Sequence, residues 1–232
     1  MEFLLLFNER TGTPAPEKEG FAAMKKYSGE LRSRGMLRRG GPLAPAAAGA
    51  TVRVRDGKAS ITDGPFPETK ELIAGFWIVD VPGRAEVLEV ARQCPHVQRG
   101  PIEVHVVRLR YTFTDSENGT PFLFAFRMEP GLVDPDDAKL REMLAFGQAL
   151  ERKGTLFETA RLGDEPPPAR VETKAGKILV TDGPFAETKD VLGGYGLVRL
   201  PGRAEAIDLA TRYPHAGWGP VEVREILFFD PV

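Results

Sequence analysis

The stretch Thr62-Asp63-Gly64-Pro65-Phe66-Pro67-Glu68-Thr69-Lys70 returns, with one change, as Thr181-Asp182-Gly183-Pro184-Phe185-Ala186-Glu187-Thr188-Lys189. The two stretches lie 119 residues apart, and the same spacing aligns the rest of the chain without a gap. From Thr62 to Val104 about half of the positions are identical, more than shared secondary structure would impose. The sequence therefore predicts a tandem duplication, with a first repeat over 1–111, a polar linker over 112–120 and a second repeat over 121–232.

Composition places the 232-residue chain among soluble globular proteins, with 42% hydrophobic and 28% charged residues and a net charge of −2. The chain has no basic excess, which argues against nucleic acid as a partner. The single cysteine, Cys94, excludes an intrachain disulfide and any cysteine-cluster metal site. The apolar run over 3–7 is too short for a signal peptide or a membrane span, so we expect a cytoplasmic protein without membrane contact.

Each repeat shows the same succession of elements. The apolar run 3–7 indicates a strand, and the segment from Pro16 to Gly35 has the three- and four-residue apolar spacing of an amphipathic helix closed by a C′ glycine. A hairpin turning at Asp56-Gly57 follows, because that dipeptide accepts the positive φ angles of a type I′ turn. A strand over 75–81, a helix over 84–94 and a strand over 102–107 complete the repeat.

Strands and helices in this order predict a split β-α-β sheet with both helices on one face, which is the ferredoxin-like arrangement. The opposite face of such a sheet must also be buried. Stacking two copies face to face achieves this, and fusion of the copies makes the dimer intramolecular. The expected fold is therefore α+β, with two ferredoxin-like repeats in one chain.

The Asp-Gly-Pro-Phe-x-Glu-Thr-Lys motif, the later Gly-aromatic strand and the Gly-Pro-x-Glu-Val segment resemble the DGPF branch of the YCII-related family. The resemblance covers nearly the whole of both copies. It implies a dimeric α+β barrel, here formed within one chain. It brings no settled activity: many relatives are uncharacterised bacterial proteins, some are linked to extracytoplasmic-function sigma factors, and a few act on small aromatic compounds, including by dehydrochlorination.

Site chemistry in the wider family is implied to rest on a histidine–aspartate pair whose histidine lies in the first helix. This sequence departs from that pattern. Neither the helix between Pro16 and Gly35 nor that between Pro135 and Gly154 contains a histidine. The histidines of the chain are His96, His105 and His215.

Asp63 and Asp182 are candidate general bases, because each stands at a strand end directly before Gly-Pro. The alternative is that each accepts hydrogen bonds from the following backbone amides in an Asx turn. His96 and His215 are the repeated groups able to exchange a proton near neutral pH. They equally suit the capping of a helix C-terminus. If a dyad exists, the pairs are Asp63 with His96 and Asp182 with His215.

Three further repeated pairs are candidate substrate-binding residues. Two of these pairs, one in each copy, combine a carboxylate with an ammonium group, which could orient a substrate or form a surface ion pair of little energetic weight. The third pair consists of one strand carboxylate from each copy, and each would need an arginine partner if it pointed inward. These residues are Glu68 and Lys70, Glu187 and Lys189, and Glu103 and Glu222.

Metal and cofactor signatures are missing from the sequence, which shows no zinc, P-loop, nucleotide-fold or serine-hydrolase pattern. We therefore expect no metal and no cofactor. The two copies differ at several aligned positions, so pseudo-symmetric pockets would differ in size and charge, or these positions have drifted neutrally. The pairs are Trp77 and Gly196, Arg99 and Trp218, Asp80 and Arg199, and His105 and Arg224.

Two functions are compatible with these observations. The first is a small-molecule site in a cleft between the repeats, with cofactor-free acid–base chemistry such as elimination or isomerisation of an aromatic or carbonyl compound. The second is a non-catalytic module that senses a ligand or contacts a protein partner, for example in sigma-factor signalling. The fused pair could also dimerise again.

Overall fold

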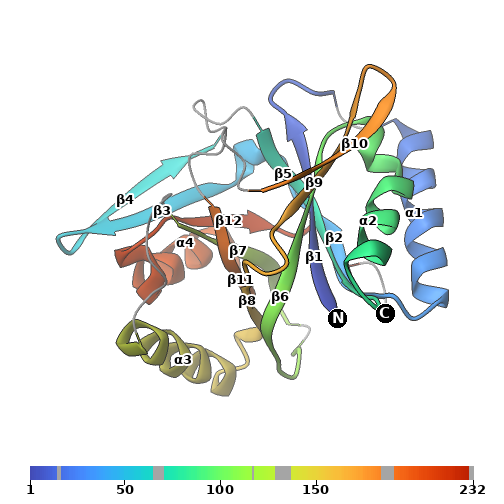
Figure 1. The fold of residues 1–232 in the computed structure, drawn as a ribbon. Helices are drawn as coiled ribbons and strands as arrows, with labels where there is room; N and C mark the ends of the chain where they lie inside the picture. The colour runs from blue at the N-terminus through green and yellow to red at the C-terminus, as the bar shows by residue number, and fades with distance from the viewer. Residues whose placement is uncertain (15–16, 65–70, 117, 129–136, 184–190, 230–232) are drawn as a thin grey trace.

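The computed structural model describes residues 1–14, 17–64, 71–116, 118–128, 137–183 and 191–229. It contains two repeats of the same eight elements (Figure 1). The first repeat comprises β1 (Glu2–Arg10), α1 (Lys18–Ser33), β2 (Leu37–Pro42), β3 (Ala50–Arg55), β4 (Lys58–Asp63), β5 (Glu71–Asp80), α2 (Arg84–Gln93) and β6 (Ile102–Thr112). The second comprises β7 (Thr120–Met128), α3 (Asp137–Arg152), β8 (Leu156–Leu162), β9 (Ala169–Lys174), β10 (Lys177–Asp182), β11 (Val191–Leu200), α4 (Arg203–Arg212) and β12 (Val221–Glu225).

The expected order lacked one strand in each repeat. β2 follows the first helix and pairs antiparallel with β5, and β8 pairs with β11 in the same way. β2 is Leu-Arg-Arg-Gly-Gly-Pro, whose glycines and proline are depleted in strands and which shows no alternation of apolar and polar residues. Its pairing with a buried neighbour, rather than its own propensity, holds this segment extended.

Local signals in the sequence account for the turns. Gly35 and Gly154 follow α1 and α3 with φ of 69° and 67°, the left-handed conformation expected at C′. Asp56 and Gly57 have φ of 50° and 72° between β3 and β4, as a type I′ turn requires.

The sheets of the two repeats form one continuous barrel. Strands follow the order β2-β5-β1-β6-β8-β11-β7-β12, and a bridge between Leu43 and Ile226 joins the two ends of this path. β6 of the first repeat thus continues into β8 of the second. The helices lie outside the barrel (Figure 1). Closure leaves no free edge in the eight barrel strands.

Each hairpin belongs to one repeat by sequence and to the other by pairing. β3 pairs with β12, the last strand of the second repeat, and β9 pairs with β6, the last strand of the first. The β3–β4 and β9–β10 hairpins extend away from the barrel on different sides (Figure 1). This exchange ties the repeats together through backbone hydrogen bonds.

The inner faces of the two sheets share one core, as the stacking hypothesis predicted. Leu4, Leu6 and Phe76 of the first repeat pack in the same cluster as Leu123 and Leu197 of the second. Two further clusters lie under the helices, one for each repeat. The fold is therefore α+β, with the two repeats paired as a pseudo-dimer within one chain.

An ion pair between a half-buried arginine and a buried glutamate marks the pseudo-two-fold axis of the barrel. Arg39 and Glu158 occupy equivalent positions, and Arg39 Nε lies 3.4 Å from Glu158 Oε2. The Glu158 side chain is fully buried and also accepts a hydrogen bond of 2.7 Å from the Tyr195 hydroxyl. Burial raises the pKa of Glu158, although Tyr195, Arg110 and Arg39 oppose that rise.

Candidate functional site

Asp63 and Asp182 each form an ion pair with the opposite repeat. Asp63, at the end of β4, contacts Arg203 at the start of α4, and Asp182, at the end of β10, contacts Arg84 at the start of α2. Arg203 also donates to the Ala48 carbonyl at 2.8 Å. The aspartate side chains are 69% and 65% exposed. Both carboxylates therefore face solvent while they connect a hairpin to the helix of the other repeat.

His96 and His215 are buried, and each is the second residue of a short 3₁₀ helix, over Pro95–Gln98 and Pro214–Gly217. His96 Nε2 lies 2.9 Å from the Asn8 carbonyl, and His215 Nε2 lies 2.8 Å from the Arg127 carbonyl. Each imidazole thus donates to a carbonyl at the end of β1 or β7. Burial lowers the pKa of His96 and lowers that of His215 to about 4, against the opposing effect of these hydrogen bonds.

The structure does not join these aspartates and histidines into hydrogen-bonded pairs in the described part of the chain. Each aspartate contacts an arginine, and each histidine contacts a carbonyl. The catalytic role of the four residues remains a prediction. Glu68, Lys70, Glu187 and Lys189 lie outside the described residues.

The carboxylates of the last strands point into the barrel, and both have arginine partners. Glu222 lies 2.7 Å from an Arg127 nitrogen and 3.2 Å from Arg224 Nη1. Burial raises the pKa of Glu222, but the charges of Arg127 and Arg224 outweigh it and hold the pKa below the ordinary value. This carboxylate has the arginine partners that an inward position was expected to need.

Glu103 is paired with a histidine, and Arg170 Nη1 lies 3.8 Å from its Oε1. His105 Nε2 lies 3.1 Å from Glu103 Oε2, and Asn8 Nδ2 donates to Glu103 Oε1 at 3.1 Å. The two residues are separated by one position on β6, so the alternation of the strand turns both inward. Their side chains are 13% and 5% exposed. Burial raises the pKa of Glu103, but the hydrogen bond with His105 and the surrounding positive charges lower it overall.

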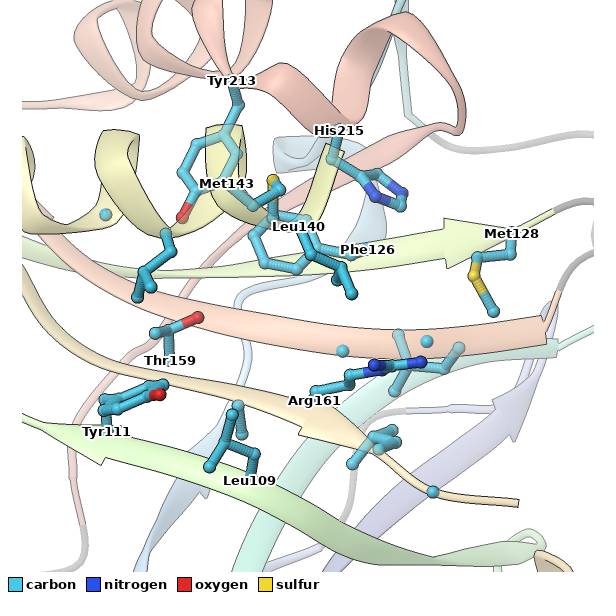
Figure 2. Close-up of a pocket in the computed structure, with 18 of the residues that line it drawn as sticks. Leu109, Tyr111, Phe126, Met128, Leu140, Met143, Thr159, Arg161, Tyr213 and His215 are labelled. Atoms are coloured by element: carbon cyan, nitrogen blue, oxygen red, sulfur yellow. The ribbon is translucent and has the colours of Figure 1, made fainter. Parts of the chain in front are cut away.

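This pair adjoins two cavities. The first, of about 320 Å³, is lined by Glu103, His105, Glu71 and Arg127 and lies between the repeats. The second, of about 380 Å³, lies between α3 and the sheet of the second repeat (Figure 2). His105 lines both, as do Asp164, Pro168, Val191 and Leu192. The two cavities therefore meet at His105.

The partnership of Glu103 with His105 escaped the sequence analysis. The sequence shows His105 only as a difference from Arg224, and Glu103 only as a repeated carboxylate. Because the two residues are at positions i and i+2 of a predicted strand, the sequence predicts that their side chains lie on the same face of the sheet. What the spacing could not show was which face borders a cavity.

The described residues include no group of three or more His, Cys, Asp or Glu side chains placed to hold a metal ion. Within the same ranges, no helix is both long and apolar enough to cross a membrane.

Comparison with known proteins identifies the repeats. The model of the YCII-related domain family matches residues 1–110 and again residues 120–230. An uncharacterized protein of Rhizobium meliloti (strain 1021) is 33% identical over 100 residues, which are 42% of this chain and 81% of that protein. A solved structure assigned as a chlorite dismutase aligns over 98% of this chain and 94% of its own, with 8% identity and a TM-score of 0.37. A score so low supports no argument about activity.

Proposed function

The chain belongs to the YCII-related domain family, as two copies in tandem, and we propose that it transfers protons on a small molecule bound between the repeats. The observation that supports this most directly is the contact between the His105 imidazole and the Glu103 carboxylate, 3.1 Å apart, where two cavities meet. The proposal places the proton transfer at this pair rather than at Asp63, Asp182, His96 and His215.

The chemistry of the pair suits a general base held by a carboxylate. His105 would take a proton from a carbon or oxygen of the bound molecule, and Glu103 would stabilise the imidazolium that results. Return of that proton to another atom would complete an isomerisation, and loss of a leaving group would complete an elimination. Arg127 lines the same cavity, where its positive charge would favour negative charge developing on the substrate.

The second repeat offers no equivalent base. Arg224 occupies the position of His105 and lies 3.2 Å from Glu222. A guanidinium stays protonated at all accessible pH values, so it cannot exchange protons. The proposed chemistry is therefore restricted to the half of the barrel that contains Glu103 and His105.

The test is proton exchange in D₂O with a panel of small aromatic and carbonyl compounds, followed by the loss of C–H signals in proton NMR. We expect His105→Arg, which copies the second repeat and places beside Glu103 a side chain that cannot accept a proton, to slow exchange by roughly 100-fold or more. Glu103→Gln should slow it by roughly tenfold or more. Asp208→Asn, at an exposed ion pair on α4, serves as the control. Unchanged exchange in His105→Arg would contradict the proposal.

A second candidate function, contact with a protein partner or a second copy of the chain, is favoured by one observation. The β10 side chains Ile178 and Leu179 are 38% and 44% exposed on the projecting hairpin. A binding module that lacks catalysis would leave every compound of the panel unexchanged, even those that bind. Sedimentation of the native protein, compared with the Leu179→Lys variant, would show whether this hairpin mediates association.

A further inference from the structure

A tryptophan fills the space between helix and sheet in the first repeat. Trp77 is 2% exposed and meets Phe7 edge to face, with ring centroids 4.9 Å apart. A Cβ atom placed on the neighbouring Gly40 would come within 2.3 Å of Trp77 Cδ1. Gly40 is thus the residue that admits the indole ring.

The second repeat reverses this arrangement. Gly196 stands at the position of Trp77, and Thr159 at the position of Gly40. Phe126, the equivalent of Phe7, is retained and lines the 380 Å³ cavity under α3. Figure 2 shows Phe126 and Thr159 beside that space. A side chain on Gly196 would meet Phe126, so the position of the missing indole borders the aromatic wall of this cavity.

The hydroxyl of Tyr213 lies in this wall. Tyr213 replaces Cys94 of the first repeat, and its ring centroid is 4.9 Å from that of Phe126 and 5.0 Å from that of Phe146. The residue is 2% exposed and lines the cavity, and its hydroxyl makes no hydrogen bond with another residue that the structure describes. Figure 2 shows the hydroxyl turned from its own backbone toward the sheet. Burial raises the pKa of Tyr213, so the hydroxyl stays a donor.

We infer that the cavity under α3 binds an aromatic compound that carries a hydrogen-bond acceptor, and that the first repeat has no such site because Trp77 occupies it. The ring would contact Phe126, Leu140 and Met143, and the acceptor would accept a hydrogen bond from the Tyr213 hydroxyl. His105 lines the same cavity, so a substituent of the ring can reach the Glu103–His105 pair. That this compound is the substrate rests on the proposed function.

The probe is 2-acetylnaphthalene, which has a two-ring aromatic body, a carbonyl acceptor and an exchangeable methyl group. Naphthalene is the matched probe without an acceptor. We expect one molecule of 2-acetylnaphthalene to bind for each chain, measured by fluorescence titration and calorimetry. Tyr213→Phe should weaken its binding by roughly fivefold, the effect of one hydrogen bond, and leave naphthalene unchanged.

The decisive variant fills the cavity as the first repeat does. Gly196→Trp combined with Thr159→Gly copies the Trp77 and Gly40 arrangement, and a Cβ on Gly196 would meet Phe126 at 3.4 Å, an ordinary contact. Binding should be lost, whereas Thr159→Gly alone, which keeps the cavity open, should retain it. Two bound molecules per chain would overturn the inference. So would an affinity equal to that of the wild-type protein in both the filled variant and Tyr213→Phe.

Exchange of the methyl protons of bound 2-acetylnaphthalene separates this inference from the proposed function. Glu103→Gln should slow exchange without a change in affinity. If wild-type protein binds the probe in the cavity but exchanges no protons, the site stands and the proposed chemistry fails. If binding is unaffected by filling the cavity while exchange still needs His105, the chemistry stands and the site is wrong.

Discussion

His215 is a base that the fold keeps neutral. Its imidazole is buried against Phe126 and Trp218, with ring centroids 5.1 Å and 4.6 Å away, and it donates to the Arg127 carbonyl. Burial lowers its pKa to about 4, from an ordinary value of 6.5. The unfolded chain therefore binds a proton at this residue over a pH range in which the folded protein does not.

The sign of the effect follows from linkage. Because the unfolded state binds more protons between pH 6.5 and 4, the free energy of unfolding falls as the pH is lowered through this window. The loss attributable to His215 is about 3 kcal/mol at most. Urea unfolding at pH 7, 5.5 and 4.5 measures it. Glu103 and Glu222, whose pKa values are also lowered, contribute in the same direction at lower pH.

The variant that isolates His215 is His215→Gln, which retains a donor for the Arg127 carbonyl but does not titrate. We expect its free energy of unfolding to depend less on pH than that of the native protein. Equal pH dependence in both proteins would show that His215 titrates with the same pKa in the folded and unfolded states, and would reopen its role in proton transfer.

At the level of elements, the exchanged hairpins give Asp63 and Asp182 a structural explanation. Each carboxylate ends a strand of one repeat and contacts the first residue of a helix in the other. The ion pair of each aspartate carboxylate with this arginine holds the hairpin against the neighbouring repeat. The sequence contained both the motif and its repetition, but the partner arginine lies 140 residues away from Asp63 and 98 from Asp182.

This explanation predicts a small energetic effect. Asp63→Asn should lower the free energy of unfolding by less than about 1 kcal/mol, because both partners of an exposed ion pair remain well hydrated. Asp182→Asn should behave alike in urea unfolding, with Asp208→Asn as the control. Loss of proton exchange in these variants, at unchanged stability, would instead restore the two aspartates as catalytic bases.

The elements that could be predicted are those whose signals are local. The helix between Pro16 and Gly35, the Asp56-Gly57 hairpin and the apolar strands all have the expected register, because periodicity and turn chemistry depend on near neighbours. β2 and β8 could not be predicted, since pairing with β5 and β11 decides them. The difference between Trp77 and Gly196 predicts only that pseudo-symmetric pockets differ in size, whereas the walls of the cavity under α3 come from segments far apart in the chain.

At the scale of the whole molecule, the two repeats are complementary rather than interchangeable. β3 and β9 each pair with the other repeat, and the inner core is shared. At the pseudo-two-fold axis, Arg39 meets Glu158 at an equivalent position. Two copies of the first repeat would place Arg39 against Arg39, and two copies of the second would place one buried carboxylate against another. Either homodimer would bring buried like charges together.

Separate expression of the halves 1–116 and 117–232 tests this complementarity. We expect neither half alone to give a cooperative unfolding transition typical of the intact chain, because each lacks a strand partner for its hairpin and a cover for its inner core. Mixed, the halves should associate one to one, as measured by sedimentation equilibrium and by recovery of the intact far-UV spectrum. Arg39→Glu in the first half should weaken association by at least tenfold, since it sets a carboxylate against Glu158. Arg39→Met, which removes the charge at similar size, is the matched control and should weaken it less. Stable homodimers of either half would show that packing of the inner faces outweighs the charge pair at the axis.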